Sequence, residues 1–220
     1  MRRPSDNERA FAEYLDNLTG RQRTERSRNG QEGDGQEDEH PVKRGRESRG
    51  KPNRSALATL RRGISGRPEV TFWLDRYIRP FIPSRATPWQ ERCYYLVAAL
   101  FATHQGTWPT DDTDERDRNL GASLAGLVRR ESQRVHAESG GVERRFIALL
   151  SSHQDDLDVH LRHVISLLAS RDVPVDWALL LCQIKHWDRE DREVQRSWAR
   201  SFWGGGLPVT NQEMASAGDG

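Results

Sequence analysis

Arginine pairs recur at three places along the chain, and each pair lies beside an apolar stripe with helical spacing. The pairs are Arg61-Arg62, Arg129-Arg130 and Arg144-Arg145. A helix that packs through its apolar stripe presents such arginines on or beside its solvent face. Because a guanidinium group donates two parallel hydrogen bonds to a phosphate, repeated surface arginines predict contact with a nucleic-acid backbone.

Helical periodicity separates the two members of each pair. At about 100° per residue, one arginine points away from the apolar stripe and its neighbour lies at the edge of that stripe. The outward members are Arg62, Arg129 and Arg144. These three side chains are therefore expected to be the most accessible of the six.

A fourth set of arginines lies on the helix expected at residues 189–202. Arg192, Arg196 and Arg200 are spaced by four and run opposite the apolar residues of that helix. Their rise of about 6 Å per step approximates the phosphate spacing of an extended strand. Acidic residues are interleaved with them, and Asp188 can pair with Arg192 one turn on. The sequence therefore favours a solvated, ion-paired face here over a nucleic-acid contact.

Other combinations of reactive side chains are weak. His160 and His163 lie one turn apart, but a metal ion needs further ligands at fixed geometry. The acidic run at residues 111–115 lacks the glycine and the glutamate spacing of a calcium loop. The seven tryptophans could stack on bases, yet most fall on apolar stripes, where core packing is expected. No metal, no cofactor and no enzymatic activity are expected.

Composition restricts how far charge can guide the interpretation. The chain of 220 residues has 34 basic and 33 acidic residues, so its net charge is +1 and any basic surface must be local. Lysine is rare beside arginine, which codon bias in a GC-rich genome would also explain. The positions of the arginines, and not their number, therefore support the nucleic-acid interpretation.

The sequence also indicates a compartment. Cys93 and Cys182 lie within apolar helical patterns, as expected for small buried thiols in a reducing cytoplasm. The first residues lack the apolar run of a signal peptide. The longest apolar stretch, residues 94–102, is about half of the ~20 residues that a membrane span needs. We expect a soluble, cytoplasmic protein without membrane contact.

The elements that must position these residues are almost all helical. The patterns predict an all-α protein of two small helical bundles, with an N-terminal lobe at residues 1–110 and a C-terminal lobe at residues 118–203. Residues 20–54 form a polar insertion that is expected to be disordered, as is the tail at residues 204–220. Ser55, Thr87 and Asp176 are expected N-caps. Expected helices are 8–18, 56–64, 69–81, 88–103, 120–138, 142–151, 157–170, 176–187 and 189–202.

Seven segments between residues 55 and 203 together resemble one known family. They are residues 55–63 (SALATLRRG), 94–102 (YYLVAALFA), 119–124 (NLGASL), 142–150 (VERRFIALL), 161–168 (LRHVISLL), 175–177 (VDW) and 198–203 (WARSFW). In this order and spacing they are similar to CasB, the small subunit of the type I-E CRISPR effector complex, Cascade. No single segment would suffice, but the set covers most of the chain.

The resemblance implies a non-enzymatic, two-lobed helical subunit that forms a homodimer within a crRNA-guided surveillance complex. Its implied partners are the large subunit, the backbone subunits, crRNA and target DNA, and its implied role is to stabilise the R-loop. The family elements map onto Arg61, Arg62, Arg144 and Arg145, and the resemblance alone adds Arg162. The full set of candidate contacts is Arg54, Arg61, Arg62, Arg129, Arg130, Arg144, Arg145, Arg162, Arg192, Arg196 and Arg200.

Two alternatives stay open at this point. The insertion at residues 20–54 departs from the short loop that the family usually has there. We favour a tolerated surface insertion, and a weak, mobile contact with the displaced strand is the alternative. For the whole chain, the competing hypothesis is a protein-only adaptor that uses apolar and aromatic surfaces. A helix-turn-helix regulator is weaker, because no short helix pair with a polar recognition face stands out.

Overall fold

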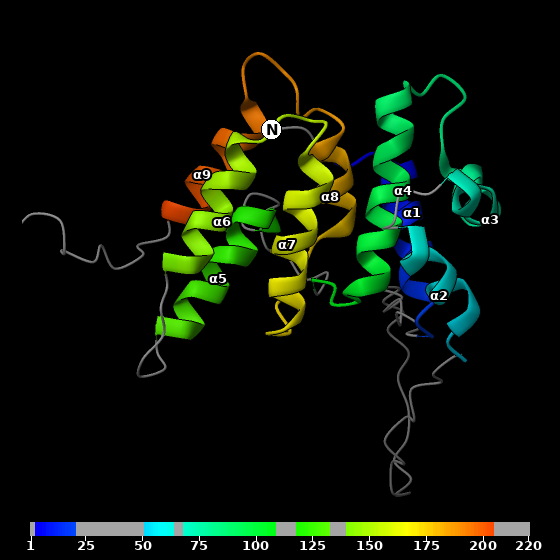
Figure 1. Ribbon diagram of the computed structural model, residues 1–220, viewed down its shortest axis with the longest axis horizontal. Helices are drawn as coiled ribbons and strands as arrows, with labels where there is room; N and C mark the ends of the chain where they lie inside the picture. Colours follow the sequence, from blue (N-terminus) through cyan, green and yellow to red (C-terminus); the bar gives the residue numbers. More distant parts are fainter. Residues whose placement is uncertain (1–2, 21–50, 64–67, 109–117, 133–139, 205–220) are drawn as a thin grey trace, which may run out of the picture.

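The computed structural model describes residues 3–20, 51–63, 68–108, 118–132 and 140–204, and these residues are mainly helical (Figure 1). Strand pairing within them is limited to one isolated bridge between Thr107 and Val175. None of the described helices is both long and apolar enough to cross a membrane. The all-α prediction is confirmed. The helices are α1 (Asp6–Asn17), α2 (Arg54–Arg62), α3 (Pro68–Ile78), the 3-10 turn η2 (Arg79–Phe81), α4 (Pro88–Thr103), α5 (Leu120–Ser132), α6 (Gly140–Ser151), α7 (Leu157–Ala169), α8 (Trp177–Ile184) and α9 (Glu193–Trp203).

Two helices begin where the sequence places their caps. Thr87 accepts a hydrogen bond from the backbone of Gln90, whose side chain in turn accepts one from the Thr87 backbone. This reciprocal pair satisfies two amide groups that the first turn of α4 would otherwise leave open. Asp176 caps α8 by accepting from the Leu179 amide at 2.9 Å. Both predicted caps are confirmed.

The predicted cap of α2 is wrong by two residues. Asn53, and not Ser55, accepts a hydrogen bond from the Ala56 amide, at 3.0 Å. The Asn53 amide also donates to the carbonyl oxygen of Leu18 at 2.8 Å, just after α1. This tertiary contact fixes where the chain turns into α2, so the helix begins at Arg54, ahead of the local signal at Ser55.

Several sequence predictions lie outside the described residues. They concern the disordered insertion at residues 21–50, the acidic loop at 109–117, the last turns of the helix expected at 120–138, and the tail from residue 205. These stay predictions. The final residue of the predicted insertion, Arg54, belongs to α2.

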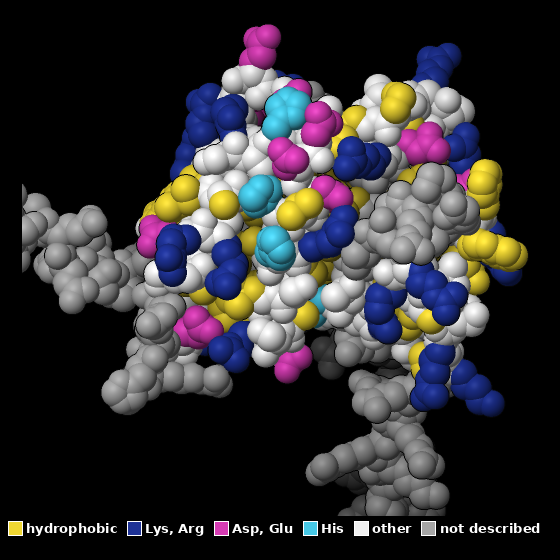
Figure 2. Space-filling model, viewed as in Figure 1, with side chains coloured by type: hydrophobic (Ala, Val, Ile, Leu, Met, Phe, Trp, Pro, Cys, Tyr) yellow, Lys and Arg dark blue, Asp and Glu magenta, His cyan; other side chains and the backbone are white. Residues whose placement is uncertain are grey.

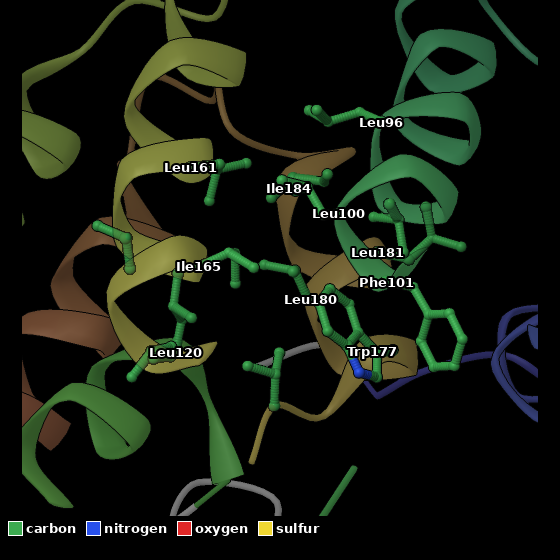
Figure 3. Packing of buried hydrophobic residues seen from close by; sticks show 14 of the residues in the cluster. Leu96, Leu100, Phe101, Leu120, Leu161, Ile165, Trp177, Leu180, Leu181 and Ile184 are labelled. Atoms are coloured by element: carbon green, nitrogen blue, oxygen red, sulfur yellow. The ribbon is translucent and has the colours of Figure 1, made fainter. Parts of the chain in front are cut away.

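Helix α4 lies in the core, as its nearly continuous apolar sequence predicts. All but one of its residues from Cys93 to Ala102 are buried. Figure 3 shows side chains from α4, α7 and α8 pointing toward one another. Within this region the ring of Phe101 meets that of Trp177 edge-on, with the ring centres 5.6 Å apart. Such edge contacts add to the free energy gained by burying the two rings.

Helix α8 comes late in the sequence but packs against helices of the N-terminal part of the chain. It packs against α1 and α4, so a segment expected in the C-terminal lobe lies among the N-terminal helices (Figure 1). The ammonium group of Lys185, directly after α8, pairs with the Glu8 carboxylate on α1, and both groups are largely shielded from solvent. The buried apolar residues form one cluster that includes helices of both predicted lobes. The division into two lobes therefore stays a prediction.

Helices α5 and α9 approach each other closely at Gly121. A Cβ atom at this position would lie 2.1 Å from the carbonyl oxygen of Trp198 on α9. Asn119 reinforces the contact because its side chain accepts from the Ala122 amide and donates to the Ser201 hydroxyl, at 3.0 and 2.7 Å. Only glycine allows this backbone approach. One turn and a half further on, Gly126 faces open space, with nothing within 4 Å of the position that a Cβ atom would take.

These two glycines of α5 give a matched test. We expect Gly121→Ala to destabilise the fold by about 1–3 kcal/mol, because α5 and α9 must move apart to admit the methyl group. Gly126→Ala should instead stabilise it by about 0.5–1 kcal/mol, because alanine is the better helix former. Chemical denaturation followed by tryptophan fluorescence measures both. Equal effects of the two substitutions would contradict the close approach.

Candidate nucleic-acid interface

The contact between α5 and α9 brings together arginines that are far apart in the sequence. Arg129 and Arg130 from the last turns of α5, and Arg200 from α9, line one open cavity of about 580 Å³. We call it the α5/α9 pocket. All three side chains are exposed. The sequence predicted these arginines as members of two separate stripes, and the tertiary contact makes them neighbours.

Arg61 has a structural role that the sequence did not predict. Its guanidinium group donates from Nε and Nη2 to the carbonyl oxygen of Ala102, at 3.1 and 2.9 Å. Ala102 lies in the last turn of α4, where carbonyl groups lack partners within the helix. Arg61 therefore ties α2 to the C-terminal end of α4. Its contact with nucleic acid stays a prediction.

Four further candidates lie at the surface of α2 and α6. Arg54 and Arg62 stand at the two ends of α2, and both side chains are exposed. On α6, Arg144 and Arg145 donate to the carbonyl oxygens of residues 140 and 141, at 3.2 and 3.0 Å. These local bonds involve backbone acceptors at the start of the same helix, so both guanidinium groups also stay exposed.

Arg162, the candidate taken from the resemblance alone, is only one-third exposed. Its Nη2 pairs with the Asp158 carboxylate at 2.6 Å, one turn back on α7. Its Nε is buried and has no hydrogen-bond partner among the described residues. Arg162 therefore combines an intrahelical ion pair with one unsatisfied donor, unlike the exposed arginines of α2, α5 and α6.

Arg192 does not join the row of arginines expected on the last helix, whereas Arg196 and Arg200 both lie on α9. Helix α9 begins at Glu193, not at residue 189, and Arg192 has left-handed backbone torsions with φ = 46°. The Arg192 guanidinium donates to the carbonyl oxygen of Leu150 on α6, and that of Arg196 donates to the carbonyl oxygen of Asp191. Arg200 alone of the three lines the α5/α9 pocket.

A local ion pair explains why α9 begins late. The Asp191 carboxylate pairs with the Arg189 guanidinium at 2.6 Å and also accepts from the Glu193 amide at 3.1 Å. The hydrogen bonds from Arg189 and from the Glu193 backbone lower the pKa of Asp191 to about 2. An aspartate that binds its own flanking backbone in this way competes with helix formation. The helical periodicity of the sequence does not show this competition.

Basic side chains do not form one continuous patch on the face drawn in Figure 2. They gather in separate groups over the α6 side and the α2 side of the molecule, with histidine side chains between them. Acidic side chains lie nearby, in keeping with a net charge of only +1. The positive surface is therefore local, as the composition predicts.

The sequence profile described as CRISPR-associated protein Cse2 matches residues 56–203. The chain belongs to the Cse2 family. A curated relative, CRISPR-associated protein Cse2 from Thermus thermophilus, is 31% identical over 153 residues, which cover 69% of this chain and 80% of the relative. The predicted resemblance is confirmed.

Solved structures agree with the family assignment. CasB from M. ruber is 26% identical, has a TM-score of 0.60, and covers 90% of this chain and 93% of its own. CasB from Thermus thermophilus is 25% identical with a TM-score of 0.62 and coverages of 91% and 99%. A chain of a CRISPR RNA-guided surveillance complex, 23% identical with a TM-score of 0.61 over 90% and 92% of the two chains, shares the fold.

The Cse2 match includes ten of the eleven candidate arginines, since only Arg54 lies before residue 56. It also includes the pocket walls that the sequence analysis missed, such as Ser123, Gly126 and Pro174. Ser123 and Gly126 come from α5, and Pro174 comes from the segment before α8. These small residues give no signal of a pocket until the fold brings the two segments together.

The other candidate chemistry finds no geometric support within the described part of the chain. There, no group of three or more histidine, cysteine, aspartate or glutamate side chains could hold a metal ion. Cys93 and Cys182 are buried, as predicted, and burial raises the pKa of the Cys93 thiol. Trp177, Trp187 and Trp198 are buried core residues.

Arg61 allows a structural arginine to be separated from a surface one. We expect Arg61→Ala to lower the free energy of unfolding by about 1–2 kcal/mol, because the Ala102 carbonyl loses two hydrogen bonds from a charged donor. Arg129→Ala, at a surface position, should change it by less than about 0.5 kcal/mol. Urea denaturation compares the two variants. A result in which both lose the same stability would refute the bridge between α2 and α4.

Proposed function

We propose that this chain is a non-catalytic subunit of a CRISPR RNA-guided surveillance complex of the Cascade type. In that role its surface arginines bind nucleic-acid backbone and stabilise the R-loop, in which a guide–target duplex lies beside a displaced DNA strand. The partners are the other subunits of the complex, a second copy of this chain, crRNA and target DNA. Membership of the Cse2 family supports the proposal.

One observation carries the nucleic-acid part of the proposal. Arginines from two helices, Arg129 and Arg130 on α5 and Arg200 on α9, converge on one cavity. No ion pair with a carboxylate is found for these three side chains among the described residues. Exposed guanidinium groups without carboxylate partners are suited to phosphate, and such contacts are independent of base sequence. A relative of the same fold belongs to a CRISPR RNA-guided surveillance complex, which supports the same context.

The test uses the complete complex with wild-type chain or with the double variant Arg129→Ala/Arg130→Ala, which removes two of the three guanidinium groups that line the α5/α9 pocket. We expect target DNA to dissociate faster from the variant complex. The slope of log affinity against log salt should fall by roughly 0.7–0.9 for each phosphate that the variant no longer binds. Filter binding over a salt series measures both quantities.

Arg189→Ala is the matched control, since the carboxylate of Asp191 already neutralises that exposed arginine. It should leave DNA retention unchanged. Native mass spectrometry of each complex shows whether the subunit is incorporated at full occupancy. Full occupancy with unchanged retention of DNA at every salt concentration would refute the nucleic-acid role.

A second candidate function, a protein adaptor without nucleic-acid contact, is favoured by one observation. Phe72 and Trp73 are adjacent on α3 and are 78% and 68% exposed. Large apolar side chains that face solvent side by side often mark a protein contact. Trp73 thus departs from the core packing that the sequence analysis expected of most tryptophans.

Substitution of the aromatic pair on α3 tests whether this surface contacts another protein. If α3 docks on a neighbouring subunit, Phe72→Ser/Trp73→Ser should lower incorporation into the complex by about tenfold or more while leaving the melting temperature of the isolated chain unchanged. Size-exclusion chromatography of the reconstituted complex measures incorporation. Unchanged incorporation would exclude this surface as an essential contact, whatever the outcome for the arginine variants.

A further inference from the structure

The α5/α9 pocket has the size and the lining of a small-ligand site. Its volume of about 580 Å³ lies within the range of ~300–1,000 Å³ usual for such sites. One wall is apolar and comes from Trp108, Val173 and Pro174. Helix α5 contributes Ala122, Ser123 and Gly126, and Ser201, Gly204 and the three arginines described above complete the lining.

Hydrogen bonds hold the apolar wall in place. The Trp108 indole donates from Nε1 to the Ser123 hydroxyl at 3.3 Å, and that hydroxyl donates to the carbonyl oxygen of Pro174 at 2.8 Å. The Val175 amide donates to the carbonyl oxygen of Gly106 at 3.1 Å, which fastens the segment before Trp108 to the segment after Pro174. The wall is therefore preorganised rather than assembled when a ligand arrives.

Gly126 leaves part of the α5 lining without a side chain. It lies within α5, where alanine would be the better helix former. A Cβ atom at this position would meet nothing within 4 Å, so packing does not require a glycine. The missing side chain leaves the helix surface open toward the pocket that Gly126 lines. A flat group can therefore lie against α5 at this position.

We propose that the α5/α9 pocket takes one unpaired nucleotide of a single-stranded segment. Its base enters the cavity lined by Gly126 and Trp108, and its phosphates lie against Arg129, Arg130 and Arg200. A nucleobase is flat, apolar on its faces and polar at its edges, which matches a lining that combines apolar residues with arginines. This inference rests on the proposed function and adds a place where a base, and not only the backbone, is held.

Two features of binding follow from this chemistry. A base within a duplex is stacked and paired, so the pocket selects single-stranded nucleic acid. Stacking on an aromatic wall depends little on which base is present, because every base has a π face. The pocket therefore holds an unpaired strand without reading its sequence.

The experiment compares two short fluorescent oligonucleotides of equal length, oligothymidylate and a chain of abasic sites with the same phosphates. Fluorescence anisotropy with the full 220-residue chain measures both affinities. We expect the wild type to bind oligothymidylate about tenfold more tightly, because the abasic strand offers no ring to stack. Gly126→Leu should abolish this preference by filling the pocket, while the affinity for the abasic strand stays unchanged.

Matched variants separate the base from the backbone. Gly140→Leu makes the same exchange on α6, away from the pocket and also with nothing within 4 Å of a Cβ atom, so it should keep the preference. Arg129→Ala/Arg130→Ala should weaken binding of both oligonucleotides, because both carry phosphates. Circular dichroism and thermal melting check whether each variant is folded.

The outcomes distinguish this inference from the proposed function. Equal wild-type affinity for the two oligonucleotides, lowered by Arg129→Ala/Arg130→Ala, would overturn the base pocket and leave backbone binding intact. A preference for oligothymidylate that survives Gly126→Leu would also overturn the pocket. Failure of both oligonucleotides to bind would count against both proposals. Displacement by an oligoglutamate peptide as effective as that by oligothymidylate would assign the pocket to an acidic protein partner and overturn the inference.

Discussion

The contact of α5 with α9 at Gly121 is the constraint on which the candidate site depends. The absence of a side chain lets the backbone of α5 reach the Trp198 carbonyl, and Asn119 fixes the approach by binding Ser201. Two helices that meet through a glycine have little freedom to slide, because the close contact allows few relative positions. Arginines carried by α5 and α9 are consequently held around a single cavity.

The arginines of this chain differ in the partners of their guanidinium groups, which are backbone carbonyls for some and carboxylates for others. Arg61 and Arg192 donate to backbone carbonyls of other helices, and Arg162 shares its charge with a carboxylate on its own helix. The net charge of +1 shows that acidic residues offset the basic ones over the molecule as a whole. A local positive field therefore requires arginines without acidic partners, and within the described residues Arg129, Arg130 and Arg200 have no ion pair with a carboxylate. Charge counting alone does not separate these classes.

The proposed role and the proposed base pocket place different demands on the same surface. Holding an R-loop needs contacts that ignore sequence, and arginine–phosphate bonds meet this need. Retaining a displaced single strand also needs a way to distinguish it from duplex, which phosphates alone provide poorly. A preorganised pocket for an unpaired base supplies that distinction. The exposed aromatic pair on α3 lies outside this chemistry and fits a protein neighbour instead.

The sequence by itself determined the helical class, the family, the caps at Thr87 and Asp176, and the burial of α4, because each depends on local spacing or on the order of whole segments. Only the tertiary structure decided which arginines are neighbours. The bond from Asn53 to Leu18 moved the start of α2, and the Asp191 ion pair shortened α9 and removed Arg192 from the expected row of arginines. The walls of the pocket come from separate segments of small or apolar residues. Such residues acquire a function only through the packing that brings them together, and helical periodicity within one segment cannot show it.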